Sequence, residues 1–437
     1  MTAEPLKTRR ILVFWMPLAG TWLMMAVEGP FLAAVIARLP DAAPNLAAYG
    51  VAFAFAIIVE SPVIMLMSAS TALVNNRDSY LVFRRFTIAL SALMTGVMLI
   101  IVMPPVFDTL ASWLNLPVAV ASLTHQALIL MLPWPGAIGY RRLLQGLLIR
   151  HDMTRRVAYG TVVRLVTMCA TAVVAGWWLS ISGALVGALA LSVAVVAEAL
   201  AVRRMSRRAI RALMDRRETE GQRLTLSNVA KFYVPLALSS FLAMGVQPMV
   251  TFFMGQSRMA LESLAVLPVL NGLTFLFRSL GLSFQDASIA LLGDHMEQYR
   301  PLRNVACAMA ILTSVCLAAI AYSPLSFLWF YDVSGLSFEL TEFAIPPLKI
   351  LVFLPALSVL LSFQRALLVN ARTTKVITSA TAIEVVGIAI VLWIAIQHFN
   401  TIGVMAAVTA IVLGRICANI LLMPACWRAT RDTAVRH

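Results

Sequence analysis

Long apolar segments alternate with short polar ones along the whole chain. Windows of about 20 apolar residues identify membrane-spanning helices, because a helix of that length crosses the roughly 30 Å of hydrocarbon in a bilayer. Twelve such windows are expected near residues 11–37, 47–74, 86–105, 120–148, 157–178, 182–203, 231–255, 265–292, 305–328, 343–369, 376–397 and 402–424. The pattern therefore predicts an all-α polytopic membrane protein with twelve transmembrane helices.

The second half of the chain repeats the first. Pro17 and Pro30 in the first span return with the same spacing as Pro235 and Pro248 in the seventh, and matched residues continue at a nearly constant offset further along the chain. Each repeat holds six predicted spans. Because six is an even number, both repeats keep the same orientation, and we expect a pseudo-two-fold axis along the membrane normal.

The repeat predicts that the chain divides into three segments: an N-terminal lobe (1–202), a basic cytoplasmic linker (203–227) and a C-terminal lobe (228–437). Transporter sites lie near the bilayer midplane at the interface of such repeats, so the architecture suggests alternating access. The linker either lies on anionic lipid as an amphipathic helix or serves only as a topology signal.

Composition and charge placement agree with a membrane protein. The chain is 61% hydrophobic and 12% charged, whereas soluble domains are about a quarter charged. Most Lys and Arg residues between the spans lie on the side of the membrane where the N-terminus is predicted. The loops on the opposite side have only two basic residues, Arg38 and Arg258. By the positive-inside rule both termini are cytoplasmic. This placement explains the net charge of +14 without a nucleic-acid partner.

Two opposite charges occupy equivalent positions in the middle of spans. Glu60 lies in the second span, and Arg278 lies at the matching position of the eighth. Ionisable residues at this depth are costly and mark functional sites in membrane proteins. One hypothesis is a charge pair that binds substrate or gates the path; the alternative is a permanent structural pair, or separate partners for each.

Glu28 lies beside Pro30 in the first span. Because proline removes a helix hydrogen bond, a backbone carbonyl near this carboxylate is available to a proton or a cation. We expect Glu28, with Glu60, to be a coupling site for H⁺ or Na⁺. The alternative is an acid near the outer mouth that is solvated by water.

Further polar residues in the spans are candidates for lining the path. Lys349 follows two prolines in the outer half of the tenth span, where it either binds substrate or reaches the interface. The candidate cavity-lining residues are Gln247, Gln285, Asp286 and Arg365. We expect most of Arg141, Arg142 and Gln145, in the inner half of the fourth span, to reach the cytoplasmic headgroups, with one or two of them as candidates for lining an inward-open vestibule.

Two ion pairs are expected inside the lobes. Arg164 and Glu198 lie in neighbouring spans of the first repeat, and Glu384 and Arg415 lie in neighbouring spans of the second with the signs exchanged. A pair satisfies both charges within one lobe, so we interpret these as structural. The five cysteines lie in or at the ends of apolar helices, which favours buried thiols over disulfides or a metal site.

Several segments resemble the progressive ankylosis (ANK) protein family. They are AVEGPFLAAVIARLPDAAPNLAAYGVAFAF, VNNRD, VQPMVTFFMGQSRMALESLAVLPV and IPPLKILVFLPALSVLLSFQRALLVNARTTK. That family belongs to the MOP superfamily, with the MATE multidrug transporters. The resemblance implies two six-helix lobes with a V-shaped cleft and export of small molecules; the ANK branch implies an anionic cargo such as pyrophosphate, nucleotides or citrate. Lys349 matches a basic position of that family, and Glu28 falls near an acid of MATE transporters. Two departures, Gln247 where some MATE transporters have an acid and the presence of Glu60, bear on coupling and cargo.

The sequence thus predicts a secondary active exporter of a small anionic solute, an antiporter with Arg278 and Lys349 as substrate ligands. A MATE-type multidrug or organic cation exporter and a lipid-linked precursor flippase remain alternatives. Scattered histidines and the lack of catalytic motifs argue against an enzyme. We expect no cofactor, a monomer, and a place in the bacterial inner (plasma) membrane.

Overall fold

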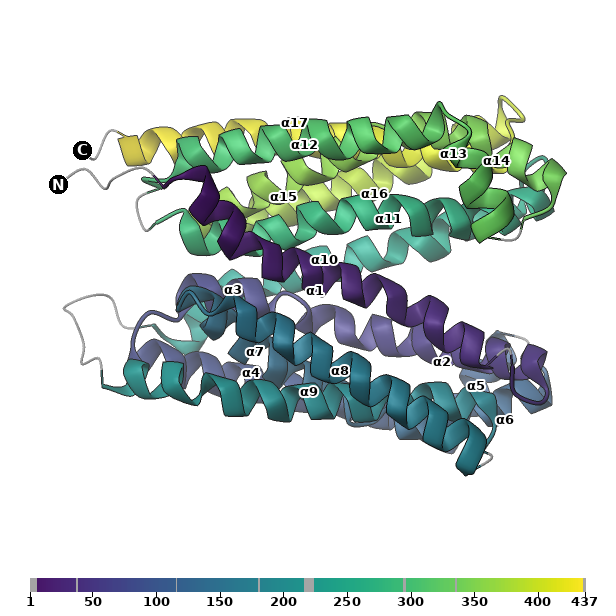
Figure 1. Ribbon diagram of the computed structural model, residues 1–437, viewed down its shortest axis with the longest axis horizontal. Helices are drawn as coiled ribbons and strands as arrows, with labels where there is room; N and C mark the ends of the chain where they lie inside the picture. Colours follow the sequence, from purple (N-terminus) through teal and green to yellow (C-terminus); the bar gives the residue numbers. More distant parts are fainter. Residues whose placement is uncertain are drawn as a thin grey trace. The chain divides into compact units, whose positions relative to one another are not determined.

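The structure of the chain is a computed structural model built of helices (Figure 1). It describes residues 6–36, 38–114, 116–179, 181–215, 224–293, 296–334 and 336–434. In that part of the chain, eleven helices are long and apolar enough to cross a membrane, and a bent helix pair makes a twelfth if counted as one span. The chain is therefore an integral, multi-pass membrane protein with the all-α architecture that the hydropathy predicts.

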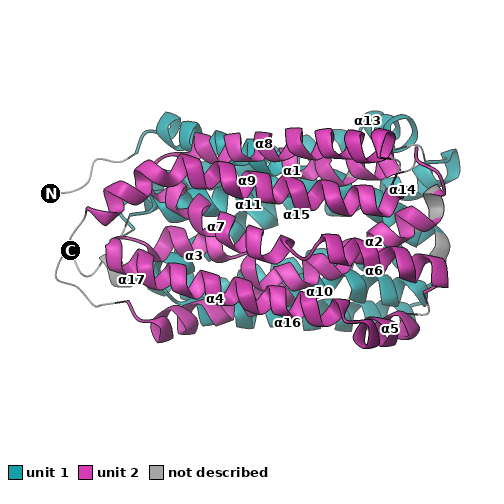
Figure 2. Ribbon diagram, turned by 90° about the horizontal axis from the view of Figure 1, so that it is seen from below, with its two compact units in different colours: residues 1–23, 242–437 teal, residues 24–241 magenta. Residues whose placement is uncertain are grey.

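The helices form two compact units, shown in different colours in Figure 2. Unit 2 is Met24–Phe241, and unit 1 joins Met1–Leu23 to Leu242–His437. The helices of unit 2 are α1 (Thr8–Ile36, from residue 24), α2 (Ala42–Glu60), η1 (Ser61–Val63), α3 (Leu66–Leu73), α4 (Arg77–Val102), α5 (Pro104–Trp113), α6 (Val118–Leu130), α7 (Trp134–Arg150), α8 (Thr154–Val173), η2 (Val174–Trp178), α9 (Gly183–Met214) and the start of α10 (Leu226–Gly255). Those of unit 1 are the start of α1, the rest of α10, α11 (Ala260–Leu291), α12 (Tyr299–Ala321), α13 (Leu325–Phe327), η3 (Leu328–Val333), α14 (Phe338–Leu351), α15 (Leu354–Asn370), α16 (Thr374–Gln397) and α17 (Gly403–Ala434).

Helices α1 and α10 are each divided between the units. Residues 1–23 belong to the unit of the C-terminal repeat, and residues 228–241 belong to the unit of the N-terminal repeat, whereas the predicted lobes assign them the other way round. Side-chain hydrogen bonds show why. In unit 1, Trp15 Nε1 on α1 donates to Ser283 Oγ on α11 over 2.8 Å. In unit 2, the Tyr233 hydroxyl on α10 donates to the Pro62 carbonyl over 2.6 Å. The first half of each helix is thus fastened to helices of the other repeat.

The two repeats agree closely in their element boundaries. Helices α2 and α11 begin at the matching residues Ala42 and Ala260, and α9 and α17 begin at the matching glycines Gly183 and Gly403. The pairs share even a capping contact. The amide of Ala184 donates to Asn45 Oδ1 over 2.9 Å. At the equivalent positions, the amide of Val404 donates to Ser263 Oγ over 3.0 Å. The internal repeat in the sequence is therefore a repeat in structure.

Prolines break three of the spans. In the second span, α2 ends at Glu60 and a 3₁₀ turn over Ser61–Val63 leads into α3. Because Pro62 has no backbone N–H, the regular hydrogen-bond ladder cannot continue there. In the fourth span, α6 and α7 are bent by 40° at a break just before Trp134. In the tenth span, α14 ends at Leu351 and α15 begins at Leu354, one residue before Pro355. The equivalent of the first break is absent from α11, which runs unbroken and has Leu280 at the position of Pro62.

Two features differ from the sequence prediction. A short helix follows the third span of each repeat, α5 in the first and α13 with the π-helical turn η3 in the second; at about ten residues, neither is long enough to register as a span. In addition, α9 continues to Met214. The predicted linker therefore begins as part of this helix, and its residues 216–223 lie outside the described residues.

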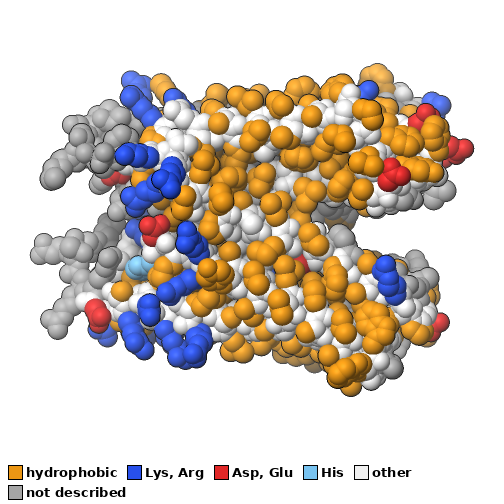
Figure 3. Space-filling view, in the orientation of Figure 1, with side chains coloured by type: hydrophobic (Ala, Val, Ile, Leu, Met, Phe, Trp, Pro, Cys, Tyr) orange, Lys and Arg blue, Asp and Glu red, His pale blue; other side chains and the backbone are white. Residues whose placement is uncertain are grey.

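Charged and apolar side chains are sorted along each unit. In Figure 3, Lys and Arg gather at one end of each unit, and hydrophobic side chains cover most of the visible face between the ends. The interior of unit 1 is a continuous apolar core that includes Leu270, Phe330 and Leu348. This distribution is typical of helices whose outer faces contact lipid.

Candidate functional site

Unit 2 encloses a network of buried charges that we call the paired cluster: Glu28, Arg141, Gln145, Arg164 and Glu198. Arg164 forms an ion pair with Glu28, and its Nη1 lies 3.8 Å from Glu198 Oε2. Arg141 forms a second ion pair with Glu198, and Gln145 Nε2 donates to the other oxygen of Glu198 over 3.1 Å. The cluster ties α1, α7, α8 and α9 together inside one unit.

The paired cluster is closed and electrically balanced. Its two arginines face two glutamates, and the ion-paired side chains are only 1–7% exposed. The pair of Arg164 and Glu198 predicted from the sequence is thus one edge of a larger network in which Glu28 takes part. Within this network one carboxylate oxygen, Oε1 of Glu28, has no hydrogen-bond partner.

The three polar side chains in the inner half of the fourth span are buried within unit 2, contrary to the prediction that most of them reach the headgroups. Arg141 is 2% exposed, Arg142 is 6% exposed and Gln145 is 2% exposed. Arg141 and Gln145 are drawn inward because Glu198 supplies a carboxylate on the facing helix α9. Their membership of the site was missed because the sequence signal, two adjacent arginines near a helix end, is also the pattern of residues that reach the interface.

Glu60 is half-buried at the end of α2, just before the break at Pro62. Its Oε2 accepts a hydrogen bond from Trp134 Nε1 over 2.8 Å, and Trp134 is the first residue of α7. Glu60 also lies close enough to Arg141 for their charges to interact. Both helix breaks of unit 2 therefore meet at this carboxylate. Because Glu60 belongs to unit 2 and Arg278 to unit 1, their pairing stays a prediction.

Unit 1 contains a second group of charges, which we call the arginine cluster: Arg278 on α11, Arg365 on α15, Glu384 on α16 and Arg415 on α17. Arg415 Nε lies 3.0 Å from Glu384 Oε1. Arg365 Nη2 donates to Thr381 Oγ1 over 3.0 Å. Arg278 and Arg365 both lie close enough to Glu384 and Arg415 for their charges to interact. The cluster thus contains three arginines and one carboxylate, of which only Arg415 and Glu384 form an ion pair.

The two clusters occupy equivalent positions in the repeat but differ in charge. Arg278 stands where the first repeat has Glu60, and Glu384 stands where it has Arg164, so both positions exchange their sign. Arg365 stands where the first repeat has Gln145, so a guanidinium group replaces a neutral amide. These three equivalent positions therefore differ in charge between the repeats: two exchange their sign, and one gains a positive charge in the second repeat.

The remaining predicted residues lie elsewhere in unit 1. Lys349 is exposed, with its Nζ 5.4 Å from the centre of the Tyr322 ring at the end of α12. Gln247 is exposed and accepts a hydrogen bond of 3.5 Å from Asn271. Gln285 and Asp286 are buried on α11, 6% and 4% exposed.

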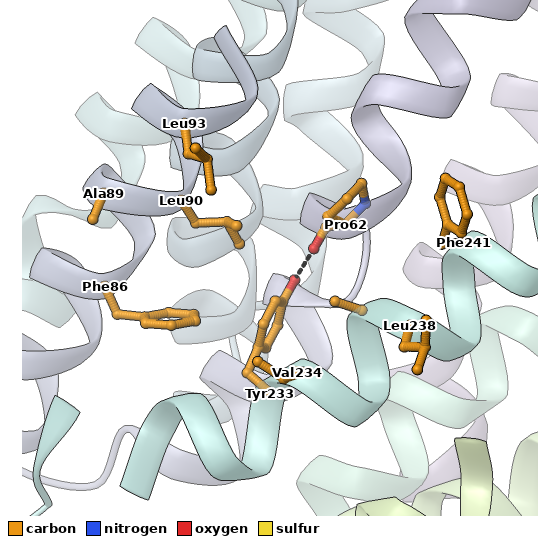
Figure 4. Close-up of a pocket in the computed structure, with 10 residues that line it drawn as sticks. Pro62, Phe86, Ala89, Leu90, Leu93, Tyr233, Val234, Leu238 and Phe241 are labelled. Carbon is orange, nitrogen blue, oxygen red and sulfur yellow. Dashed lines mark hydrogen bonds between the residues drawn. The ribbon is translucent and has the colours of Figure 1, made fainter. Parts of the chain in front are cut away.

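An apolar groove lies in unit 2 between α4 and the first half of α10. Its volume is about 520 Å³, and Phe86, Leu90 and Phe241 are among its lining residues (Figure 4). The hydroxyl of Tyr233 points across it to the Pro62 carbonyl. The groove carries no charged lining residue, so it suits an acyl chain or another apolar group and not an ion. No group of three or more His, Cys, Asp or Glu suited to a metal ion occurs among the described residues.

No protein-family model and no curated protein sequence matches the chain. Solved structures do match it. A MOP superfamily transporter from Pyrococcus furiosus, described as having a binding pocket of reverse polarity, aligns with a TM-score of 0.78 at 13% identity over 98% of this chain and 96% of that one. A MATE transporter from Vibrio cholerae aligns with a TM-score of 0.76 at 14% identity over 98% and 97% of the two chains.

A eukaryotic MATE transporter aligns equally well, with a TM-score of 0.76 at 12% identity over 98% of both chains. Identities this low show the fold alone. The chain therefore has the fold of MATE transporters of the MOP superfamily, as the sequence resemblance predicts for that superfamily.

Proposed function

We propose that the protein is a secondary active transporter that moves a small anionic organic solute across the membrane by alternating access. The observation that supports an anionic cargo is the arginine cluster, where Arg278, Arg365 and Arg415 face one carboxylate inside unit 1. A cationic cargo is disfavoured by such a group, since like charges repel strongly where water is scarce. The fold supports the transporter class.

The expected cargo has the chemistry implied by the ANK resemblance: citrate, pyrophosphate or a nucleotide, exported from the cytoplasm. The positive-inside distribution supports cytoplasmic termini and a place in the bacterial inner membrane. Solutes of this kind carry two or more negative charges at neutral pH. Their export by a monomer without a cofactor is part of the proposal.

We propose that the driving ion acts in unit 2. Glu28 and Glu60 are carboxylates that a proton or Na⁺ neutralises, and the unpartnered Oε1 of Glu28 is available to such an ion. Because Arg164 pairs with Glu28, neutralising Glu28 would release Arg164 to Glu198 alone. Binding of the driving ion at Glu28 would thus change the ion pairing of Arg164 within unit 2.

A test of the coupling role uses Glu28→Gln, which keeps the size of the side chain and removes its charge. Transport is measured in vesicles over a range of internal and external pH, and separately with and without a Na⁺ gradient. The proposal expects the variant to lose the dependence on one of these gradients. An unchanged dependence on both gradients means that Glu28 does not couple.

A second candidate function is the export of organic cations. Unit 2 favours it, because Glu60 is a half-buried carboxylate outside the balanced paired cluster. The apolar groove of about 520 Å³ would suit the hydrophobic part of a drug or of a lipid-linked precursor. In this reading the arginine cluster is structural.

Uptake measurements in proteoliposomes distinguish these candidates. Labelled citrate, pyrophosphate and ATP are compared with cationic dyes, with and without pH and sodium gradients, and each compound is tested as a competitor of the others. Saturable anion uptake that dyes do not inhibit supports the proposal. Dye uptake that cations alone inhibit supports the second candidate instead.

A further inference from the structure

The arginine cluster of unit 1 carries two positive charges in excess of its only carboxylate. Glu384 pairs with Arg415, which leaves Arg278 and Arg365 without an opposite charge of their own. Asp286, two turns further along α11, has interactions of its own. Burying a charge without a partner is expensive. The paired cluster of unit 2 avoids this cost by matching its two arginines with two glutamates.

The helices that carry the arginine cluster pack closely against one another. A Cβ atom at Gly281 would lie 3.1 Å from the backbone of Val359, so α11 and α15 approach closely one turn after Arg278. Similarly, a Cβ atom at Gly414 would lie 2.6 Å from the Ile388 side chain and 3.3 Å from the Glu384 carbonyl, so α17 is pressed against α16 next to Arg415. Close backbone packing therefore fixes the helix segments that carry Arg278 and Arg415.

The guanidinium groups have unused hydrogen-bond donors. The Nε atoms of Arg278 and Arg365 are buried without a hydrogen-bond partner. Arg365 uses one Nη atom on Thr381, and within the described part of unit 1 Arg278 makes no hydrogen bond or ion pair. Each guanidinium offers five N–H donors in a planar fork. Both side chains, like that of Arg415, are half-buried, so part of each remains reachable from outside the packed core.

We propose that the arginine cluster is a binding site for a doubly charged oxyanion group, a phosphate or a pair of carboxylates, held by Arg278 and Arg365 next to the ion pair of Arg415 and Glu384. The excess of two positive charges sets the charge of the ligand. Arginine forks match the paired oxygens of phosphate and carboxylate groups, whereas a spherical halide uses neither their planarity nor their spacing. As a cargo site the cluster rests on the transport function proposed above, but as an anion site it stands on its own contacts.

The same chemistry has two sources, a soluble anion and the phosphate of a lipid headgroup. A binding measurement separates them without requiring transport. The purified protein is placed in an uncharged detergent, and its thermal unfolding is followed by tryptophan fluorescence at constant ionic strength. Inorganic phosphate, pyrophosphate, citrate and chloride are titrated separately, and a fifth series uses mixed micelles with phosphatidylglycerol.

The site predicts that oxyanions raise the unfolding temperature saturably and that chloride does not. Arg278→Gln and Arg365→Gln should each weaken the apparent affinity about tenfold or more, since each removes charge-assisted hydrogen bonds. Arg365→Gln introduces the residue that the first repeat has at the equivalent position, Gln145, and is therefore a mild change. The matched control is Arg303→Gln, because Arg303 packs on the Tyr299 ring outside the cluster.

The outcomes have separate meanings. Saturable stabilisation by soluble oxyanions that is weakened in both variants and kept in the control supports a solute site, and the same pattern with phosphatidylglycerol alone supports a headgroup site. Equal effects of chloride and phosphate, no stabilisation by any ligand, or unchanged affinity in both variants overturns the proposal. If Arg278→Gln does not fold, Arg278→Lys replaces it and should bind with intermediate affinity. Binding without flux refutes the transport function and leaves the site, whereas flux without binding to the cluster refutes the site alone.

Discussion

At the scale of single residues, the interior of this protein is governed by how each charge is satisfied. In unit 2, Arg164 lies between Glu28 and Glu198, and Arg141 secures Glu198 from the other side. Removing one partner of a buried ion pair is costly because the other charge stays behind, whereas removing both is nearly neutral. The first repeat has both charges, Arg141 and Glu198, whereas the second has neither and places Leu361 and Ala418 at the equivalent positions.

The paired cluster makes a prediction about stability. Arg141→Leu introduces the residue of the second repeat, Leu361, and leaves Glu198 under-compensated, so we expect a loss of about 3 to 5 kcal/mol. Adding Glu198→Ala, which introduces the equivalent of Ala418, should restore most of that loss. Thermal unfolding in detergent measures both variants. A double variant less stable than the single one would mean that the charges are not coupled as described.

The sequence predicted part of this site. Charges of opposite sign in neighbouring spans indicate the pairs of Arg164 with Glu198 and of Glu384 with Arg415, since both members of each pair lie at similar depth. The contact of Arg164 with Glu28 was not predictable, because Glu28 lies on a distant helix whose rotation the sequence does not specify. Arg141 was misassigned for a related reason: the choice between headgroup and core depends on which carboxylate faces it.

At the scale of elements, the spans follow from hydropathy alone. Each of the twelve predicted segments corresponds to a helix or a broken helix pair, because about 20 apolar residues form a helix long enough to cross the bilayer. The prolines indicate where spans break, as at Pro62 and before Trp134. Short helices such as α5 escape this reasoning, since their length and composition do not set them apart from an apolar loop.

Close approach of α11 and α15 makes a prediction about an element pair. Gly281→Ala places a methyl group 3.1 Å from the Val359 backbone, so the helices must separate, and we expect a loss of about 1 to 3 kcal/mol together with weaker anion binding. Gly272→Ala on the same helix is the matched control, because a Cβ atom there meets nothing within 4 Å. This control should be neutral or up to about 1 kcal/mol more stable. Unfolding and anion titrations of the two variants, measured side by side, decide the matter; equal effects would contradict tight packing at Gly281.

At the scale of the whole molecule, the chain is a doubled six-helix repeat whose two copies have taken different charges. The duplication is kept in helix boundaries and in the capping contacts of Asn45 and Ser263. The buried charges differ between the two repeats: the paired cluster of unit 2 has equal numbers of arginines and glutamates, whereas the arginine cluster of unit 1 has more arginines than carboxylates. A repeat that retains its geometry while changing its charges places two different electrostatic environments within one fold.

The charge asymmetry along the membrane normal makes a prediction about topology. In a cysteine-free background, Arg38→Cys and Arg258→Cys should react with a membrane-impermeant maleimide added to intact cells, because both loops are expected outside. Arg207→Cys and Arg428→Cys should react only after the membrane is permeabilised. Labelling of Arg428→Cys in intact cells would reverse the predicted orientation.

An anionic cargo bound at Arg278 is tested by solute flux through the wild-type protein and Arg278→Gln in the same proteoliposome preparation. Labelled pyrophosphate and citrate are compared with a cationic dye, and Arg303→Gln serves as the control. We expect saturable anion uptake by the wild type and the control, a loss of about tenfold or more in apparent affinity in Arg278→Gln, and no dye uptake. Dye uptake without anion uptake, or anion uptake that is indifferent to Arg278, would contradict an anionic cargo bound at this residue.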